Sequence, residues 1–211
     1  NTILSTRGGI TIRRGDHNLV SGNIILGNGK EGAEGIRVTG ENNTVQGNFI
    51  YSCDYGFRIM SGEYTVADLT GKYVPNIKRN VNVPLYPQVK KLALRDNVVV
   101  GVTGADLEMG FGYKKDWPES QMILLPEDCT IQNNRFLRPK GGTSVIGIMP
   151  DKTPELKRFK FQPNLFSDNV LFGGRNEYSP SADGFKILQV PAGWSENAEI
   201  LRIKPLRPVD V

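Results

Sequence analysis

The sequence predicts an all-β fold, a right-handed parallel β-helix in which short strands coil around one core. A short unit centred on Asn recurs along the chain, and segments typical of strands lie between the copies. The 24 glycines and 13 prolines disfavour long helices and favour tight turns. The 211 residues are enough for one domain with a substantial core. A sandwich or propeller would also be rich in short strands, but the regular period favours a solenoid.

The repeated unit consists of an apolar residue, two mostly polar or small residues, Asn, and then a β-branched or aromatic run. Its asparagines are separated by 22, 25, 49, 37 and 35 residues, and they are Asn1, Asn23, Asn48, Asn97, Asn134 and Asn169. Steps of 22 and 25 fit one coil, 49 fits two coils, and the longer single steps fit a coil with an inserted loop. Because stacked strands lie about 4.8 Å apart, these side chains are expected to form a hydrogen-bonded ladder.

A second series of strands interleaves with the first, at residues 9–13, 35–38 and 56–59. Each alternates inward apolar with outward polar residues, as a sheet with one solvated face requires. Three segments break the pattern and are expected to be surface excursions that often wall a binding face: 61–88, 111–128 and 150–164. We therefore assign residues 1–174 to β-helix coils and residues 175–211 to a tail or cap. Because the chain starts at Asn1 inside a repeat unit, further coils are expected upstream.

Composition excludes several classes of protein. Cys53 and Cys129 cannot build a disulfide-dense scaffold or a zinc cluster, and we expect them to be unbridged, on different sides of the Asn turn. No window reaches the roughly 18 consecutive apolar residues of a membrane span, so no membrane partner is expected. The net charge of +4 suits a polyanion. Without a Lys/Arg run or a basic amphipathic helix, the sequence predicts a glycan and no nucleic acid.

Three arginines are the main candidate binding residues. Arg13, Arg37 and Arg58 occupy similar places on three successive coils, so we expect them to stack on one face. Guanidinium groups at such spacing repel one another by about 1 kcal/mol per close pair at a protein surface. A bound anion would relieve that repulsion. Alternatively, each arginine pairs with a neighbouring acid such as Asp16, Glu41 or Asp54.

The segments 9–15, 23–27 and 35–40 resemble the core of polysaccharide lyase family six, which includes alginate lyases and dermatan-cleaving lyases of the chondroitinase B type. The run from Tyr86 to Lys90, followed by Asn97, is similar to later coils of that family. The resemblance covers roughly residues 1–172.

The resemblance implies β-elimination at a uronate, with a Lys base and a Ca²⁺ ion that neutralises the substrate carboxylate. The residues that supply these groups precede the arginine motif, so we assign no metal ligand in this chain. Arg13 matches the catalytic arginine. Because a guanidinium hardly ever loses its proton, its first role is electrostatic stabilisation of developing charge. Proton donation, directly or through water, comes second.

The remaining candidate residues are assigned to substrate binding. Arg37 matches a contact to the substrate carboxylate, and Arg58 continues the column. Tyr86 contacts sugar, assists proton transfer or packs on the surface. The family commonly has His where this chain has Arg14, a departure that affects substrate choice or activity. His17 either substitutes for that histidine in part or is an exposed turn residue.

These patterns predict a secreted or periplasmic lyase of acidic polysaccharide, alginate before dermatan sulfate. We expect the chain to be an incomplete portion, with little lyase activity unless coils from the same or another chain precede it. One alternative is a non-catalytic glycan-binding β-helix, such as an adhesin or tail-spike-like module. Another is a purely structural solenoid, which predicts that acidic side chains neutralise the arginine column.

Overall fold

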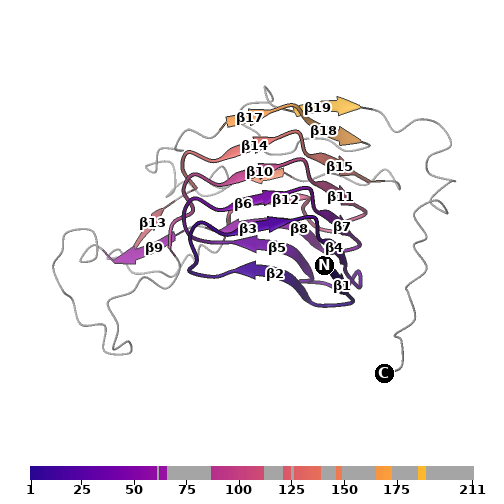
Figure 1. The fold of residues 1–211 in the computed structure, drawn as a ribbon, viewed down its shortest axis with the longest axis horizontal. Helices are drawn as coiled ribbons and strands as arrows, with labels where there is room; N and C mark the ends of the chain where they lie inside the picture. Colours follow the sequence, from indigo (N-terminus) through magenta and orange to yellow (C-terminus); the bar gives the residue numbers. More distant parts are fainter. Residues whose placement is uncertain are drawn as a thin grey trace, which may run out of the picture.

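The computed structural model describes residues 1–60, 62–65, 87–111, 121–124, 126–138, 146–148, 165–172 and 185–188. Within these residues the secondary structure is strand and turn, without helix. The strands stack in parallel around a common interior, as the predicted β-helix requires (Figure 1). The predicted fold class is therefore confirmed.

Among the described residues, three parallel sheets form the walls of the solenoid, and the chain visits them in the order A, B, C on each coil. Sheet A contains β1 (Thr2–Leu4), β4 (Ile24–Leu26), β7 (Phe49–Tyr51), β11 (Val98–Val100), β15 (Arg135–Leu137), β18 (Asn169–Phe172) and β19 (Phe185–Leu188). Sheet B contains β2 (Gly8–Ile12), β5 (Glu34–Val38), β8 (Tyr55–Met60), β12 (Leu107–Phe111) and β16 (Ile146–Ile148). Sheet C contains β3 (Leu19–Ser21), β6 (Thr44–Gln46), β10 (Ala93–Arg95), β14 (Thr130–Gln132) and β17 (Leu165–Ser167).

A separate antiparallel pair, β9 (Gly62–Thr65) with β13 (Gln121–Leu124), lies beside the solenoid (Figure 1). These strands come from two of the segments predicted as excursions. Most of the rest of 61–88 and 111–128, and all of 150–164, lie outside the described residues. Within 175–211, assigned to a tail or cap, β19 extends sheet A by pairing with β18; the other residues of that segment are not described.

The predicted asparagine ladder is confirmed at the corner between sheets C and A. Each side-chain amide donates to the side-chain oxygen of the next, at 3.2, 2.9, 3.0, 2.9 and 3.0 Å along the series from Asn1 to Asn169. From Asn23 onward each amide also donates to a backbone carbonyl, as Asn97 does to Val45 at 3.0 Å. The ladder thus meets the hydrogen-bonding needs of side chains that are buried from Asn23 onward.

One detail of the predicted spacing is wrong. The step of 49 residues was interpreted as two coils, but Asn48 bonds Asn97 directly and β7 pairs with β11. These residues therefore form one coil that carries an insertion. The ladder sets the distance between corners, whereas it places no limit on the length of chain that leaves the solenoid between them.

The residue before each internal ladder asparagine adopts a left-handed backbone conformation. The φ angles are 64°, 61°, 58°, 51° and 55° at Gly22, Gly47, Asp96, Asn133 and Asp168. Gly avoids the steric cost of this conformation, and Asn and Asp tolerate it better than most residues. The corner therefore explains why Gly, Asp or Asn precedes each of these asparagines.

A column of glycines marks the corner where the chain enters sheet B. A Cβ atom on Gly9, Gly35 or Gly56 would lie 2.8, 2.7 or 2.7 Å from a side-chain carbon of sheet A and closer still to a carbonyl of the next coil. The missing Cβ of Gly35 thus points inward, and its neighbour Ile36 is also buried. Two successive inward positions leave residues 34 and 37 together on the outer face.

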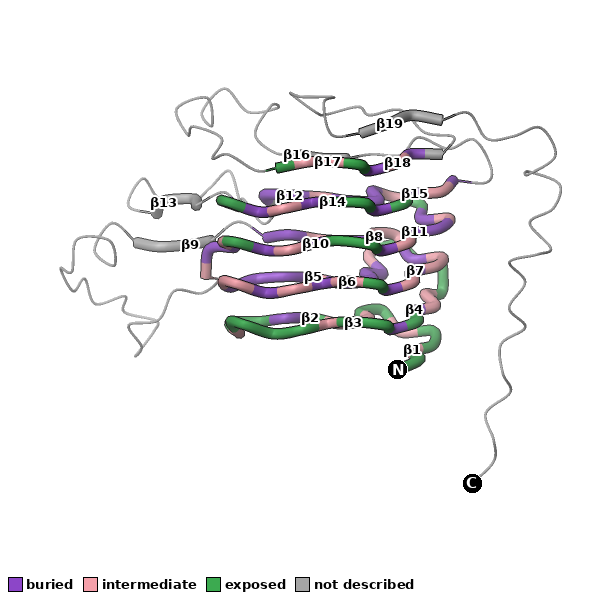
Figure 2. Tube along the Cα trace, turned by 45° about the horizontal axis from the view of Figure 1, so that its top comes forward, coloured by how far each residue is buried: buried purple, intermediate pink, exposed green. Residues whose placement is uncertain are grey.

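The core consists of columns of like side chains in register. In sheet A the buried column runs through Ile25, Ile50, Val99, Phe136 and Leu171. Figure 2 shows buried residues lining the interior, while the coil that carries β1, β2 and β3 is largely exposed. Middle coils therefore supply most of the buried apolar area that stabilises the fold.

The two cysteines are buried in this core and are not bridged, as predicted. Burial raises the pKa of the Cys53 thiol to about 11 and that of the Cys129 thiol to about 12. Both remain protonated at neutral pH and serve as small apolar side chains.

Candidate functional site

The arginines predicted to stack do so only in part. Arg37 on β5 lies in register with Arg58 on β8, and Arg58 lies in register with Glu108 on β12. On β2, however, the residue paired with Arg37 is Thr11. The prediction that Arg13 occupies the same position is therefore wrong, because the register places Arg13 two residues farther along the chain, just beyond the end of β2.

The displacement still leaves Arg13 near Arg37. A step of two residues along a strand and one strand across separates their backbones by roughly 8 Å. Arg13 is exposed, whereas the exposed fractions of the Arg37 and Arg58 side chains are 29% and 14%. Access for a ligand therefore decreases from Arg13 to Arg37 to Arg58.

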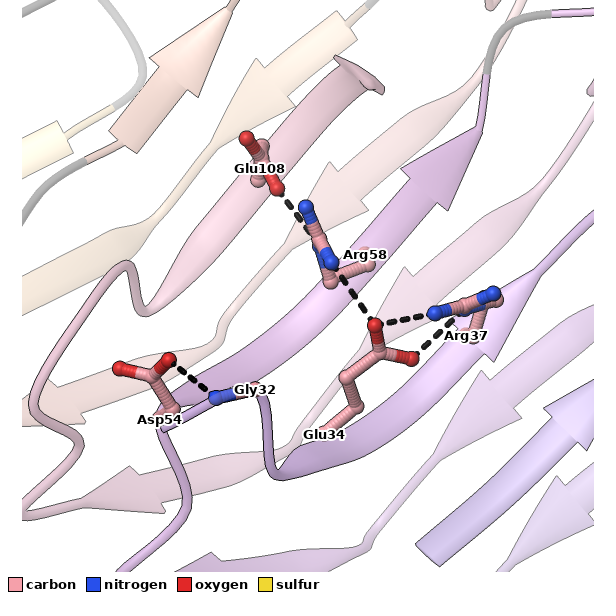
Figure 3. A network of polar contacts seen from close by, with 6 residues as sticks. All are labelled: Gly32, Glu34, Arg37, Asp54, Arg58 and Glu108. Atoms are coloured by element: carbon pink, nitrogen blue, oxygen red, sulfur yellow. Dashed lines mark hydrogen bonds and ion pairs between the residues drawn. The ribbon is translucent and has the colours of Figure 1, made fainter. Parts of the chain in front are cut away.

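Glu34 connects the two arginines that are in register. Its carboxylate accepts two hydrogen bonds from Arg37, one of them from Nε at 2.6 Å, and one from Nη1 of Arg58 at 2.8 Å. Arg58 Nε also donates to Glu108 at 2.7 Å, so Arg58 lies between two carboxylates (Figure 3). We call Glu34, Arg37, Arg58 and Glu108 the sheet B network.

The network keeps Glu34 ionised although its side chain is only 8% exposed. Burial by itself would raise the pKa of this carboxyl group. Hydrogen bonds from Arg37 and Arg58, together with their positive charges, outweigh that effect and hold the pKa below its ordinary value of 4.5. Glu34 is thus a fixed negative charge beneath two guanidinium groups.

Tyr55 completes the environment of Arg58. The guanidinium carbon of Arg58 lies 4.0 Å from the centre of the Tyr55 ring, within range of a cation–π interaction. Burial and the nearby Glu108 carboxylate raise the pKa of the Tyr55 hydroxyl. Arg58 is therefore held by two carboxylates and an aromatic ring, an arrangement that fixes its position.

This geometry corrects the hypothesis that an external anion is needed to relieve repulsion within the column. Two carboxylates of the chain itself balance Arg37 and Arg58, as the purely structural alternative predicted. The partners are Glu34 and Glu108. Of the acids suggested from the sequence, Asp16 accepts a hydrogen bond from the Glu41 amide at 2.6 Å. Asp54 accepts one from the Gly32 amide at 2.7 Å (Figure 3).

Arg13, Arg14 and His17 lie together at the turn that leads from sheet B to sheet C. The Arg14 amide donates to the Thr39 hydroxyl at 2.9 Å, and that hydroxyl donates to the Ile12 carbonyl at 3.0 Å. Arg14 and His17 have positive φ angles of 62° and 59° and are exposed. His17 is thus a turn residue, one of the two roles considered for it. Tyr86 lies outside the described residues.

Glu34, Glu108 and Tyr55 were not predicted from the sequence. Glu34 immediately precedes Gly35, and the inward bend at that glycine brings it to the outer face beside Arg37. Glu108 aligns with Arg58 only through the pairing of β8 with β12. The sequence separation of 50 residues between them conceals that pairing.

The resemblance implies a calcium ion. Within the described residues no three His, Cys, Asp or Glu side chains lie close enough together to hold a metal ion, so this part of the chain does not fit a calcium site. Nor does this part of the chain contain a helix long and apolar enough to cross a membrane.

Comparison with solved structures confirms the resemblance in fold. A PL6 family polysaccharide lyase from Pseudopedobacter saltans matches with a TM-score of 0.67 and 30% identity, over 92% of this chain and 46% of that one. A mannuronic acid specific family 6 lyase from human gut microbiota matches with a TM-score of 0.62 and 21% identity, over 95% of this chain and 41% of that one.

The PL6 family alginate lyase AlyGC also has a TM-score of 0.62, with 21% identity over 90% of this chain and 22% of that one. The present chain thus spans less than half the length of each of these three proteins. No family model and no curated protein matches the sequence.

Proposed function

We propose that this β-helix, which has the fold of PL6 polysaccharide lyases, takes part in β-elimination on a uronate-containing acidic polysaccharide, with alginate the first candidate and dermatan sulfate the second. The observation that carries the proposal is the position of Arg13, exposed at the end of β2 and about two residues and one strand from Arg37. Two cationic side chains of graded exposure on one face suit a polymer with a carboxylate on each sugar.

In the proposed reaction the C5–H bond of a uronate breaks and its proton passes to a base. A double bond forms between C4 and C5 while the C4–O4 bond breaks, and O4 acquires a proton. Arg13 stabilises the negative charge that develops during these steps. Proton delivery to O4 by Arg13, or through a water that it orients, is the second role we consider.

Arg37 is proposed to bind a substrate carboxylate, with its guanidinium held in place by the sheet B network. Arg58 is more enclosed, and we assign it to the support of that network and of the charge around it. Arg14 adds a second positive charge next to Arg13, and the exposed His17 lies in the same turn. We also propose a secreted or periplasmic location, because a polysaccharide of this kind is met outside the cytoplasm. No calcium ligand is assigned in this chain, and the roles proposed for its residues in the β-elimination do not depend on calcium.

The direct test is to incubate the full-length protein with polymannuronate, polyguluronate and dermatan sulfate and to follow the ultraviolet absorbance of the unsaturated uronate. Parallel reactions contain added Ca²⁺ or a chelator, because the resemblance implies a metal. Release of unsaturated product that is abolished by Arg13→Ala supports the proposal. The balanced charges of the sheet B network are what a purely structural solenoid predicts, and such a solenoid would neither bind nor cleave these polymers. A non-catalytic glycan-binding module is the other candidate. That candidate predicts saturable binding of the same polymers without product.

A further inference from the structure

The two arginines of the sheet B network have different carboxylate contacts. Glu34 is the acid that bonds Arg37, whereas Arg58 bonds both Glu34 and Glu108. Glu34 contacts Arg37 through both carboxylate oxygens, in the parallel arrangement that fixes the plane of a guanidinium group as well as its position. The exposed part of Arg37 therefore has a defined direction.

The position of Glu34 is itself fixed by the residues that surround it. Its side chain is almost entirely buried, and the neighbouring Gly35 makes the close turn into sheet B. The added hydrogen bond from Arg58 holds the same carboxylate from the next coil. An acid held on several sides is a rigid anchor for a flexible arginine, whose long side chain would otherwise lose conformational entropy when it bound a ligand.

We infer that Glu34 is a positioning residue that orients Arg37 to bind a carboxylate of an acidic glycan, an inference that rests on the proposed function. Glu34 acts through Arg37 and does not itself touch the glycan. It fixes one edge of the guanidinium and directs the rest toward the exposed side of sheet B. Specificity for a carboxylate at a fixed distance from Arg13 follows from this orientation.

The inference predicts an effect opposite in sign to that of simple charge. Glu34→Gln removes a negative charge near the site, so a field effect alone would strengthen the binding of an anion. If Glu34 positions Arg37, the same substitution weakens binding, because the guanidinium is no longer held in the productive orientation. The sign of the change therefore separates the two accounts.

The test measures the Kd for a mannuronate tetrasaccharide by calorimetry and, where turnover is seen, kcat and KM. Glu34→Gln is expected to raise Kd and KM by about tenfold and to leave kcat nearly unchanged, the pattern of lost substrate positioning. Glu34→Asp keeps the charge but shortens the side chain, and it is expected to weaken binding several-fold. If Glu34→Gln fails to fold, the Kd of Glu34→Asp tests whether Glu34 positions Arg37.

Glu127→Gln is the matched control. Glu127 pairs with Lys90 at 3.5 Å, and its substitution removes one negative charge as Glu34→Gln does. This variant is expected to bind the tetrasaccharide as the wild type does. An equal loss in both variants would show a general effect of charge or stability and would overturn the inference.

A double-mutant cycle supplies the decisive readout. If Glu34 acts through Arg37, then Glu34→Gln has little further effect once Arg37→Ala is present. Additive losses would mean that Glu34 acts by another route. If the wild type binds the tetrasaccharide and Glu34→Gln binds it equally or more tightly, this inference is overturned while the proposed function stands. A wild-type protein that neither binds nor cleaves the tetrasaccharide overturns the proposed function, and the inference with it.

Discussion

At the scale of single residues, three arginines that look equivalent in the sequence have different environments. Arg13 lies beyond the end of β2 and is exposed. Arg37 is partly exposed and bonded to Glu34, while Arg58 is mostly enclosed by Glu34, Glu108 and the Tyr55 ring. These differences suggest separate tasks of charge stabilisation, substrate binding and support.

The first prediction separates Arg13 from Arg37 by their kinetic effects. In the catalytically active protein, Arg13→Ala should lower kcat roughly 10²-fold, which corresponds to a loss of about 3 kcal/mol of transition-state stabilisation. Arg37→Ala should mainly raise KM, because it removes binding common to the ground state and transition state. Initial rates over a range of alginate concentrations measure both. Small and equal effects would indicate a binding surface without chemistry.

The second prediction concerns acid and Glu34. Its folded pKa is below the ordinary 4.5, so its contribution to stability is complete above that value and is lost as the pH falls through the folded pKa. We expect Glu34→Gln to lower the free energy of unfolding at neutral pH and to make its decline below pH 4.5 less steep. Urea unfolding at a series of pH values measures both changes. Parallel curves for the variant and the wild type would contradict this assignment.

The position of a residue could be predicted where the sequence repeat determines it. It could not be predicted where the pairing of strands far apart in the sequence determines it. The asparagines follow a visible sequence unit, and all of them lie in the ladder as predicted, although the step from Asn48 to Asn97 is one coil and not two. Arg13 was misplaced because it comes four residues after Gly9, whereas Arg37 comes two residues after Gly35. Alignment of the glycines would have revealed the difference. Glu108 could not be placed, because 50 residues of sequence separate it from its partner Arg58.

At the scale of elements, the corners carry more of the fold's specificity than the strands do. Most strands of sheets A and C contain only three residues, so each contributes few backbone hydrogen bonds. The ladder side chains connect successive corners through buried amides, and from Asn48 onward each one also bonds backbone groups of the preceding coil. The sequence repeat is therefore easiest to recognise at this corner, where Asn meets the hydrogen-bonding requirement in each coil.

The third prediction tests the ladder at its middle and its edge. Asn97→Ala leaves several buried groups without their partners, including the Asn48 amide and the Val45 carbonyl. We expect a loss of roughly 3–5 kcal/mol in the free energy of unfolding, since each such group costs about 1–3 kcal/mol. Asn1→Ala removes one partly exposed bond and should cost about 0.5–1 kcal/mol. Equal losses from urea unfolding would show that the ladder does not act through burial.

At the scale of the whole molecule, the stability of each coil of the solenoid depends on the adjacent coils. Each coil buries its apolar columns only against the coils on either side, so the total is close to a sum of coil and interface contributions. The period of the repeat was sufficient to predict this architecture. The segments that leave the solenoid have no such period, and their course was not predictable from spacing.

The last prediction follows from that nearest-neighbour character. In the chain of residues 1–211, β7 pairs with strands on both sides, whereas β1, β2 and β3 each pair on one side. Hydrogen exchange followed by mass spectrometry should therefore find the slowest amides in β5, β7 and β11 and much faster exchange in β1 and β3. Asn97→Ala should accelerate exchange most in β7, β11 and β15, because the lost amide links those coils. Global two-state unfolding would instead raise the slowest rates everywhere by the same factor. Uniform protection in the wild type, or a uniform change in the variant, would show that the coils unfold as one unit and that the solenoid description of its energetics is wrong.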